Sequence, residues 1–191
     1  MKNIIEQRFK EHIAVSSQSL IECQNQIFKV SELLIEVLKS GKKILICGNG
    51  GSAADSQHFA AELVSSFSKN KTRNGIPAIA LTTDTSVITA YSNDFEFEGV
   101  FARQVNALGV PGDCLVVLST SGNSKNCIKA AEEAKAKGLR TVALLGDSGL
   151  LRNLADHVIS VPSSNTQNIQ EMHILTYHIL SELIEEFWTQ N

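Results

Sequence analysis

The sequence has no long apolar run, no surplus of positive charge and no closely spaced pair of cysteines. None of its apolar stretches approaches the ~18 residues of a membrane-spanning helix, so we predict that the chain is not an integral membrane protein. It carries 17 Lys and Arg against 20 Asp and Glu, a formal net charge of −3. Non-specific binding to nucleic acid or to a membrane surface depends on a basic surplus, so we expect neither partner.

The cysteines and the N-terminus both argue for a reducing compartment. Four cysteines are widely spaced and form no Cys-x-x-Cys pair: Cys23, Cys47, Cys114 and Cys127. This spacing disfavours a disulfide framework or a thiolate zinc site and favours reduced, buried thiols. The first residues mix charged and apolar side chains and lack the uninterrupted apolar region of a secretory signal, so we predict a cytoplasmic protein.

The length and composition of the chain are those of one globular domain. Its 191 residues, 43% of them hydrophobic, suffice to bury a sizeable core, and we find no internal repeat, low-complexity tract or linker. We predict a single domain over 1–191, with an N-terminal helical extension at 1–40 and an α/β core at 42–191.

The N-terminal extension has apolar residues at helical spacing. We predict a break in this helical region where Ser16 or Ser17 can cap a second helix, and an end at Gly41. An apolar stripe on long helices next to a complete sheet indicates subunit packing. Alternatively, the helices cover only their own sheet.

The rest of the chain alternates between short apolar runs and helical patterns. The apolar runs are 43–47, 78–81, 114–118, 141–145 and 158–161. They are too continuous for half-exposed strands and indicate a buried parallel sheet. The helical patterns are 52–67, 84–107, 124–138, 148–155 and 167–189. This alternation predicts an α/β, flavodoxin-like sheet of five parallel strands with helices on both faces. Ligands of such sheets bind beyond the carboxyl ends of the strands.

The first predicted strand leads into the glycine-rich segment GNGGSAAD, which begins at Gly48. Glycines let the backbone turn sharply and approach a ligand, and the following helix offers free N–H groups. The letters also fit G-x-G-x-x-A, a variant dinucleotide fingerprint that requires an acidic residue about 20 positions on. The nearest candidate, Asp84, lies too far along the chain, and no Walker lysine follows the glycines. A tight turn without a ligand is the alternative interpretation.

The third predicted strand leads into a loop rich in hydroxyl groups, at Ser119, Thr120, Ser121 and Ser124. Four hydroxyls and a glycine at a helix N-terminus can surround a phosphate with donors, and the helix dipole adds attraction. Lys125 is the only nearby cation, which suits a sugar phosphate better than a triphosphate with magnesium. The alternative is a helix cap with a polar turn, for which one serine would suffice.

Two helices carry candidates for acid–base chemistry or metal binding. His58 and Glu62 lie at i and i+4 after the glycine loop and share one helix face, where they can bind a divalent ion or act as an acid–base pair. A surface pair is the alternative. His173 and His178 on the final helix are separated by about 140° around its axis, so they should not serve one site. Spacing alone does not decide between them.

Taken together, CGNGGS, HFAAEL, SNDF, LSTSGNS and IQEMH with His178 resemble the sugar isomerase (SIS) domain family over nearly the whole chain. The resemblance implies a homotetramer with active sites built between subunits and one zinc ion per subunit. The activity it implies is the conversion of sedoheptulose 7-phosphate to D-glycero-D-manno-heptose 7-phosphate through an enediol. That reaction is the first step of nucleotide-activated heptose synthesis in bacteria. Lipopolysaccharide biosynthesis is one destination of the heptose, and capsule and S-layer glycan are the alternatives that the sequence leaves open.

The resemblance also assigns roles to individual residues. It implies that Glu62 and His178 are the catalytic pair, which selects His178 over His173. The implied zinc ligands are His58, Glu62, Gln170 and His178. The implied substrate-binding residues are Asn49, Gly50, Gly51, Ser52, Glu62, Asn93, Asp94, Ser119, Thr120, Ser121, Ser124 and Gln170.

Three features qualify this assignment. On a straight helix the Cα atoms of Gln170 and His178 are about 12 Å apart. Both reach one ion only if their side chains converge, the helix starts late or different subunits contribute. The family often has Arg where this chain has Asn168, so a charged contact to the substrate or a neighbour is missing. A relative with this fold binds the bacterial replication initiator and lacks the acid–base pair at the positions of Glu62 and His178; here both are present. A non-enzymatic binding protein is therefore the alternative function.

Overall fold

The structure, a computed structural model, describes residues 2–190. Strands and helices alternate along this part of the chain, as the sequence predicts. The elements are α1 (Lys2–Lys39), β1 (Ile44–Gly48), α2 (Gly51–Val64), β2 (Ala78–Ala80), α3 (Thr85–Asp94), a 3₁₀ turn η1 (Phe97–Gly99), α4 (Val100–Leu108), β3 (Cys114–Ser119), α5 (Lys125–Ala136), β4 (Arg140–Leu145), a 3₁₀ turn η2 (Leu150–Asn153), β5 (His157–Ser160) and α6 (Thr166–Gln190).

The five strands form one parallel sheet in the order β2-β1-β3-β4-β5. Every residue of β1 and β3 is buried, because these central strands are covered on both faces. The predicted α/β fold with a five-stranded parallel sheet is therefore confirmed. The chain leaves β1 toward one edge of the sheet and returns to pair β3 on its other side. The ends of β1 and β3 thus form the switch point at which such sheets bind ligands.

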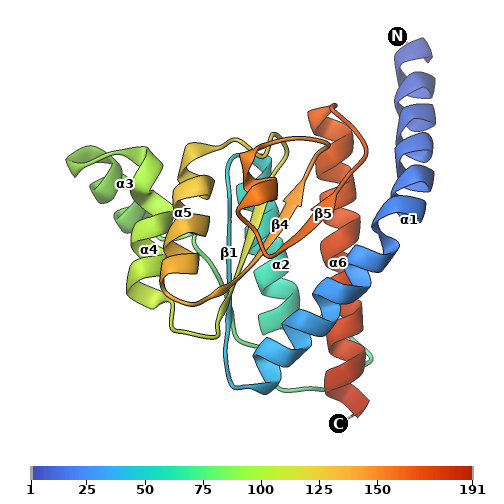
Figure 1. Ribbon diagram of the computed structural model, residues 1–191. Coiled ribbons are helices and arrows are strands. Elements are labelled where there is room, and N and C mark those ends of the chain that lie inside the picture. Colours follow the sequence, from blue (N-terminus) through green and yellow to red (C-terminus); the bar gives the residue numbers. More distant parts are fainter. Residues whose placement is uncertain (1, 191) are drawn as a thin grey trace.

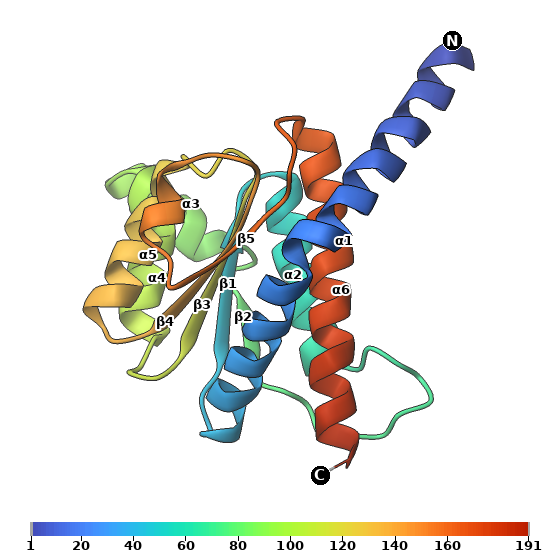
Figure 2. The same cartoon turned by 45° about the vertical axis from the view of Figure 1, so that its right-hand side comes forward.

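Two helical layers enclose the sheet (Figures 1 and 2). One layer contains α1, α2 and α6, whose buried residues share a core with one face of the sheet, including Leu34, Phe59 and Tyr177. The other contains α4 and α5, with α3 alongside, and packs on the opposite face through residues such as Val105 and Ala130. Among residues 2–190, no helix is long and apolar enough to cross a membrane.

The N-terminal helix is continuous, and the predicted break near Ser16 and Ser17 is wrong. The Ser17 hydroxyl donates to the Ile13 carbonyl one turn back at 2.8 Å, so it joins the helix instead of capping a new one. The C-terminal half of α1 packs on the sheet and α6 through buried residues such as Leu34. The N-terminal half projects beyond the rest of the chain (Figure 2) and exposes apolar side chains: Ile4, Ile5, Phe9, Ile13, Leu20 and Ile21.

Two predicted helices are shorter or divided. The region 84–107 divides into α3, η1 and α4, because the backbone leaves the helical conformation at Phe95 (φ −130°, ψ −100°) and is extended at Glu96 (φ −154°, ψ 145°). The region 148–155 contains only the 3₁₀ turn η2. It follows Gly149, whose φ of 114° is incompatible with a helix.

Candidate functional site

Two glycines of the glycine loop that joins β1 to α2, Gly48 and Gly51, lie directly against neighbouring groups, and Gly50 between them has a left-handed backbone. A Cβ on Gly48 would lie 2.7 Å from the Ser52 carbonyl oxygen and 2.9 Å from that of Leu118 on β3. Gly50 has a φ of 56°, in the left-handed region that favours glycine. A Cβ on Gly51 would lie 2.1 Å from Nε2 of Gln170, so this glycine admits the α6 side chain to the start of α2.

An amide pair joins the glycine loop to the serine loop. Asn49 Nδ2 donates to Asn126 Oδ1 at 2.9 Å, and Asn126 Nδ2 donates back to Asn49 Oδ1 at 2.8 Å. Asn126 lies in the first turn of α5 and is buried. The sequence analysis missed Asn126, since a single Asn behind a serine-rich loop carries no signal of its own. Asn49 therefore fixes the distance between the two ligand loops.

The serine loop places hydroxyl groups at the N-terminus of α5. Ser124 occupies the N-cap position, but its side chain accepts no hydrogen bond from the helix. Its Oγ instead accepts a long hydrogen bond of 3.4 Å from Ser119 Oγ. The loop backbone turns at Gly122, with a φ of 64°, where a Cβ would lie 2.6 Å from the Ser148 carbonyl oxygen. Since Ser124 does not cap the helix, helix capping alone does not account for the serines in this loop. Hydroxyl groups at a helix N-terminus are suited to binding an anion.

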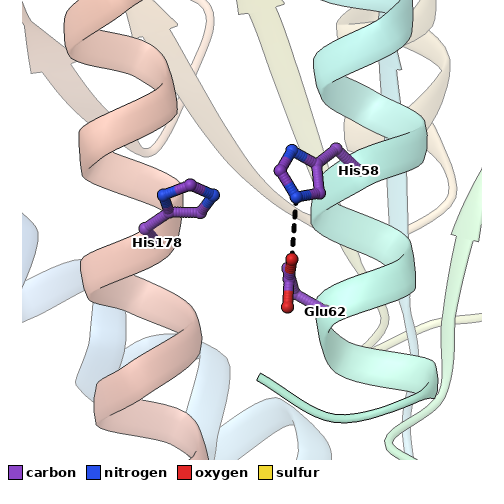
Figure 3. Close-up of side chains that lie close together, drawn as sticks. All are labelled: His58, Glu62 and His178. Carbon is purple, nitrogen blue, oxygen red and sulfur yellow. Dashed lines mark hydrogen bonds and ion pairs between the residues drawn. The ribbon is translucent and has the colours of Figure 1, made fainter. Parts of the chain in front are cut away.

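Three side chains from two helices converge on one another (Figure 3). His58 and Glu62 project from α2, and His178 projects from α6 toward them. His58 Nε2 lies 2.7 Å from Glu62 Oε1, and the His58 and His178 ring centroids are 5.1 Å apart. One ligand atom from each residue lies within 4.8 Å of the others. Two imidazole nitrogens and a carboxylate oxygen are donors that Zn²⁺ prefers, so the set fits this ion.

The structure separates the two candidate histidines of α6. His178 belongs to the three-residue cluster, whereas His173 lies in the core and is fully buried. Burial lowers the pKa of His173 to about 4, which keeps its ring neutral at pH 7. His173 therefore has a structural role in the core. His178 is the histidine of α6 whose position is suited to chemistry.

Gln170, another implied zinc ligand, lies apart from the cluster. Its Nε2 donates to Asp55 Oδ2 at 3.1 Å, and the same side chain packs on Gly51. Asp55 is buried, and this burial raises its pKa, although the hydrogen bond from Gln170 opposes the shift. Within one chain, Gln170 therefore faces the glycine loop, and its place as a ligand stays a prediction.

Asn93 and Asp94 lie at the end of α3, on the other face of the sheet from α6 (Figure 1). Both are exposed, and Asn93 Nδ2 donates to Asp94 Oδ1 at 2.9 Å. Within one chain, therefore, Asn93 and Asp94 lie across the sheet from the cluster of His58, Glu62 and His178. Asp84 caps α3 by accepting from the Val87 N–H at 3.0 Å, which accounts for its carboxylate without a dinucleotide. Asn168, in the first turn of α6, is buried.

A buried ion pair joins the end of α2 to α6. Arg73 Nε donates to Glu185 Oε1 at 3.0 Å, and both side chains are almost completely buried. The remaining guanidinium nitrogens donate to the carbonyl oxygens of Glu62 and Leu63, each at 2.8 Å. Glu185 also accepts the Phe67 N–H at 3.0 Å, together with that of the next residue. These bonds draw the chain out of the helix, so α2 ends at Val64 and not at the predicted residue 67.

Tyr177 is a neighbour of the cluster that the sequence analysis missed. Its hydroxyl lies 2.9 Å from His58 Nδ1, and its ring stacks on Phe59 at a centroid distance of 5.5 Å. Burial, with smaller contributions from the Asp55 and Glu62 charges, raises the Tyr177 pKa above its ordinary value. At an apolar helical spacing, a tyrosine resembles any core residue, so no pattern in the sequence marks it.

The fold and the site residues together indicate membership of a known protein family. The SIS domain family matches residues 8–146, and the chain belongs to this family. Its similarity within the family is to phosphoheptose isomerases. The protein of that name from Nitratiruptor sp. is 52% identical over 95% of this chain and 97% of its own length.

Two solved phosphoheptose isomerase structures share the fold over almost all of both chains. The structure from Neisseria gonorrhoeae has a TM-score of 0.92 at 40% identity and covers 97% of this chain and 98% of that chain. The structure from Francisella tularensis has a TM-score of 0.93 at 38% identity and covers 96% and 97%. The family expected from the sequence motifs is therefore confirmed.

Proposed function

We propose that this protein is an aldose–ketose isomerase that converts sedoheptulose 7-phosphate to D-glycero-D-manno-heptose 7-phosphate. The observation that carries the proposal is the convergence of Glu62 and His178 from two helices. The same chain carries a phosphate-type loop at the N-terminus of α5. Similarity to phosphoheptose isomerases over nearly the whole chain supports the same substrate. A role limited to binding is not favoured, because it would leave this acid–base pair unused.

The proposed reaction needs two kinds of side chain, one to bind the phosphate and one to transfer protons. Ser119, Thr120, Ser121 and Ser124, with the N-terminus of α5, hold the phosphate of the open-chain sugar. Glu62 removes a proton from one of the carbons C1 and C2 and returns it to the other. His178 exchanges a proton with the neighbouring oxygens, so that a cis-enediol lies between the ketose and the aldose. Both groups act as positioned acid–base catalysts.

We assign a zinc site to His58, Glu62 and His178, with Gln170 as the fourth ligand that the family resemblance implies. The bound ion would polarise the C1 and C2 oxygens and stabilise negative charge on the enediolate. Coordination makes a carboxylate less basic, so we expect the ion to be weakly held or Glu62 to alternate between ligand and base.

The decisive experiment is an isomerase assay with sedoheptulose 7-phosphate, run beside five- and six-carbon sugar phosphates. We expect turnover of the seven-carbon substrate, its loss on chelation and its return when zinc is added. Turnover of only the shorter sugars would contradict the proposed substrate. Full activity in a demonstrably metal-free sample would contradict the zinc site and leave the isomerase assignment standing.

The serine loop yields a separate prediction. Ser124→Ala removes a hydroxyl that does not cap α5, so the helix should keep its stability. A hydrogen bond to a charged group contributes about 1.5–3 kcal/mol, so we expect KM for the sugar phosphate to rise about 10- to 100-fold. Steady-state kinetics measure this change, with Ser40→Ala at the exposed end of α1 as the control. An unchanged KM in Ser124→Ala would remove this residue from the phosphate site.

We also propose a homotetramer with active sites shared between subunits. The exposed apolar side chains on the projecting half of α1 support subunit packing. Shared sites would also bring Asn93 and Asp94 of one subunit to another subunit's cluster. Size-exclusion chromatography with light scattering should yield four times the 20.8 kDa chain mass; a monomer would contradict the assembly. We place the reaction in the cytoplasm, at the start of nucleotide-activated heptose synthesis for lipopolysaccharide, capsule or S-layer glycan.

A further inference from the structure

Two consecutive residues of α6 enclose the His58 ring. The Tyr177 ring meets it edge-on at a centroid distance of 5.4 Å and an interplanar angle of 75°. The His178 ring also meets it edge-on, at 5.1 Å and 81°. Neighbouring residues of a helix point about 100° apart, so the two side chains approach His58 from different directions. Tyr177 is itself held by its stacking on Phe59 and is fully buried.

Each nitrogen of the His58 ring has its own partner. Nε2 lies 2.7 Å from Glu62 Oε1, and Nδ1 lies 2.9 Å from the Tyr177 hydroxyl. An ionised carboxylate only accepts hydrogen bonds, so in a neutral ring this contact places the proton on Nε2. Nδ1 then accepts from the Tyr177 O–H. In this arrangement the Glu62 carboxylate, the His58 ring and the Tyr177 hydroxyl each have a hydrogen-bond partner.

Binding of a cation at Nε2 would reverse the donor and acceptor roles of the two His58 ring nitrogens. Nε2 can bind a metal ion only through its lone pair, so the single proton of a neutral ring must then lie on Nδ1. Nδ1–H becomes a donor, and the same Tyr177 oxygen can accept from it. A phenol is both donor and acceptor, whereas a carbonyl or a carboxylate would pair with only one of the two tautomers. The number of protons on the ring is the same before and after the change.

We propose that Tyr177 is a positioning residue whose hydroxyl holds the His58 ring in place in both tautomers, so that Nε2 can pass from Glu62 to a divalent cation without the ring moving. The inference rests on the zinc site of the proposed function. His58 needs such support, because its side chain is 48% exposed to solvent. Partners that orient a metal-binding histidine typically contribute 10- to 100-fold in metal affinity.

The test is Tyr177→Phe, which removes one oxygen and keeps the ring that packs on Phe59. We expect its dissociation constant for Zn²⁺, measured by competition with a chromophoric chelator, to rise about 10- to 100-fold. The thermal unfolding midpoint of the metal-free protein should stay close to the wild-type value. Tyr91→Phe is the matched control, because Tyr91 is the only other tyrosine in the sequence. It lies in α3, across the sheet, and its ring packs on that of Phe95.

A spectroscopic measurement separates positioning from general packing. With Co²⁺ in place of Zn²⁺, the visible absorption bands of Tyr177→Phe should differ from those of the wild type, while Tyr91→Phe should match it. Wild-type Zn²⁺ affinity and an unchanged Co²⁺ spectrum in Tyr177→Phe would overturn the role of Tyr177 and leave the zinc site intact. A wild-type protein that binds neither ion would overturn the zinc site together with this inference.

Discussion

Glu62→Gln should lower kcat for sedoheptulose 7-phosphate by about 10²- to 10⁴-fold, the usual contribution of a positioned acid–base group. Glutamine keeps the shape of the side chain but cannot take a proton from carbon. Its amide can still contact His58, so we expect the α2–α6 packing and the unfolding midpoint to change little. The measurement is steady-state kinetics at saturating zinc, so that weaker metal binding does not mimic the loss of the base.

Glu132→Gln is the matched control for this variant. Glu132 is an exposed carboxylate on α5, in the helical layer that lies across the sheet from α2 and α6. The same chemical change at this position should leave kcat at the wild-type value. Equal turnover by Glu62→Gln and wild type would remove Glu62 as the base, whatever the metal content.

Arg73→Ala should lower the free energy of unfolding by about 3–5 kcal/mol, the range for removing one member of a buried ion pair. The substitution leaves the Glu185 charge buried without its partner and frees the carbonyl oxygens of Glu62 and Leu63. The last turn of α2, which carries Glu62, should therefore lose order as well. Urea denaturation at one fixed protein concentration measures the loss, since an assembly makes stability depend on concentration.

The segment between α2 and β2, which contains Arg73, also contains one member of a more exposed ion pair that can be compared with the buried one. Lys71 pairs with Glu186 one residue further along α6, but there the side chains are 28% and 46% exposed. Water screens this pair, so Lys71→Ala should cost at most about 1 kcal/mol. The double variant of Arg73→Met with Glu185→Met should be more stable than Arg73→Ala, because no buried charge is left alone. Similar losses in Arg73→Ala and Lys71→Ala would show that burial of the Arg73 pair is not what matters.

Features that depend on neighbouring residues in the chain could be predicted from the sequence. The continuous apolar runs predict the strands, because a strand covered on both faces has no polar side to display. His58 and Glu62 are four residues apart on one helix, so their contact follows from helix geometry alone. The chemistry of the two loops after β1 and β3 is also local, since glycines and hydroxyls have these properties wherever the loops lie.

Features that depend on distant segments were missed or left open. Spacing on α6 could not choose between His173 and His178, because the choice depends on which side of that helix faces α2. Tyr177 and His58 are 119 positions apart, and no local pattern connects them. The break predicted at Ser17 failed for a related reason. A serine can cap a helix or bond back to the preceding turn, and local sequence does not decide between the two.

The sequence by itself therefore determined the α/β architecture, the two ligand loops and the residue types available for isomerisation, because periodicity and residue chemistry are local properties. Only the tertiary structure decided that α6 lies across α2, so that His178 completes the pair begun by His58 and Glu62 while His173 enters the core. The physical reason is burial. The rotation of α6 about its axis is set by which apolar side chains pack on the sheet, and that packing joins residues from the whole length of the chain.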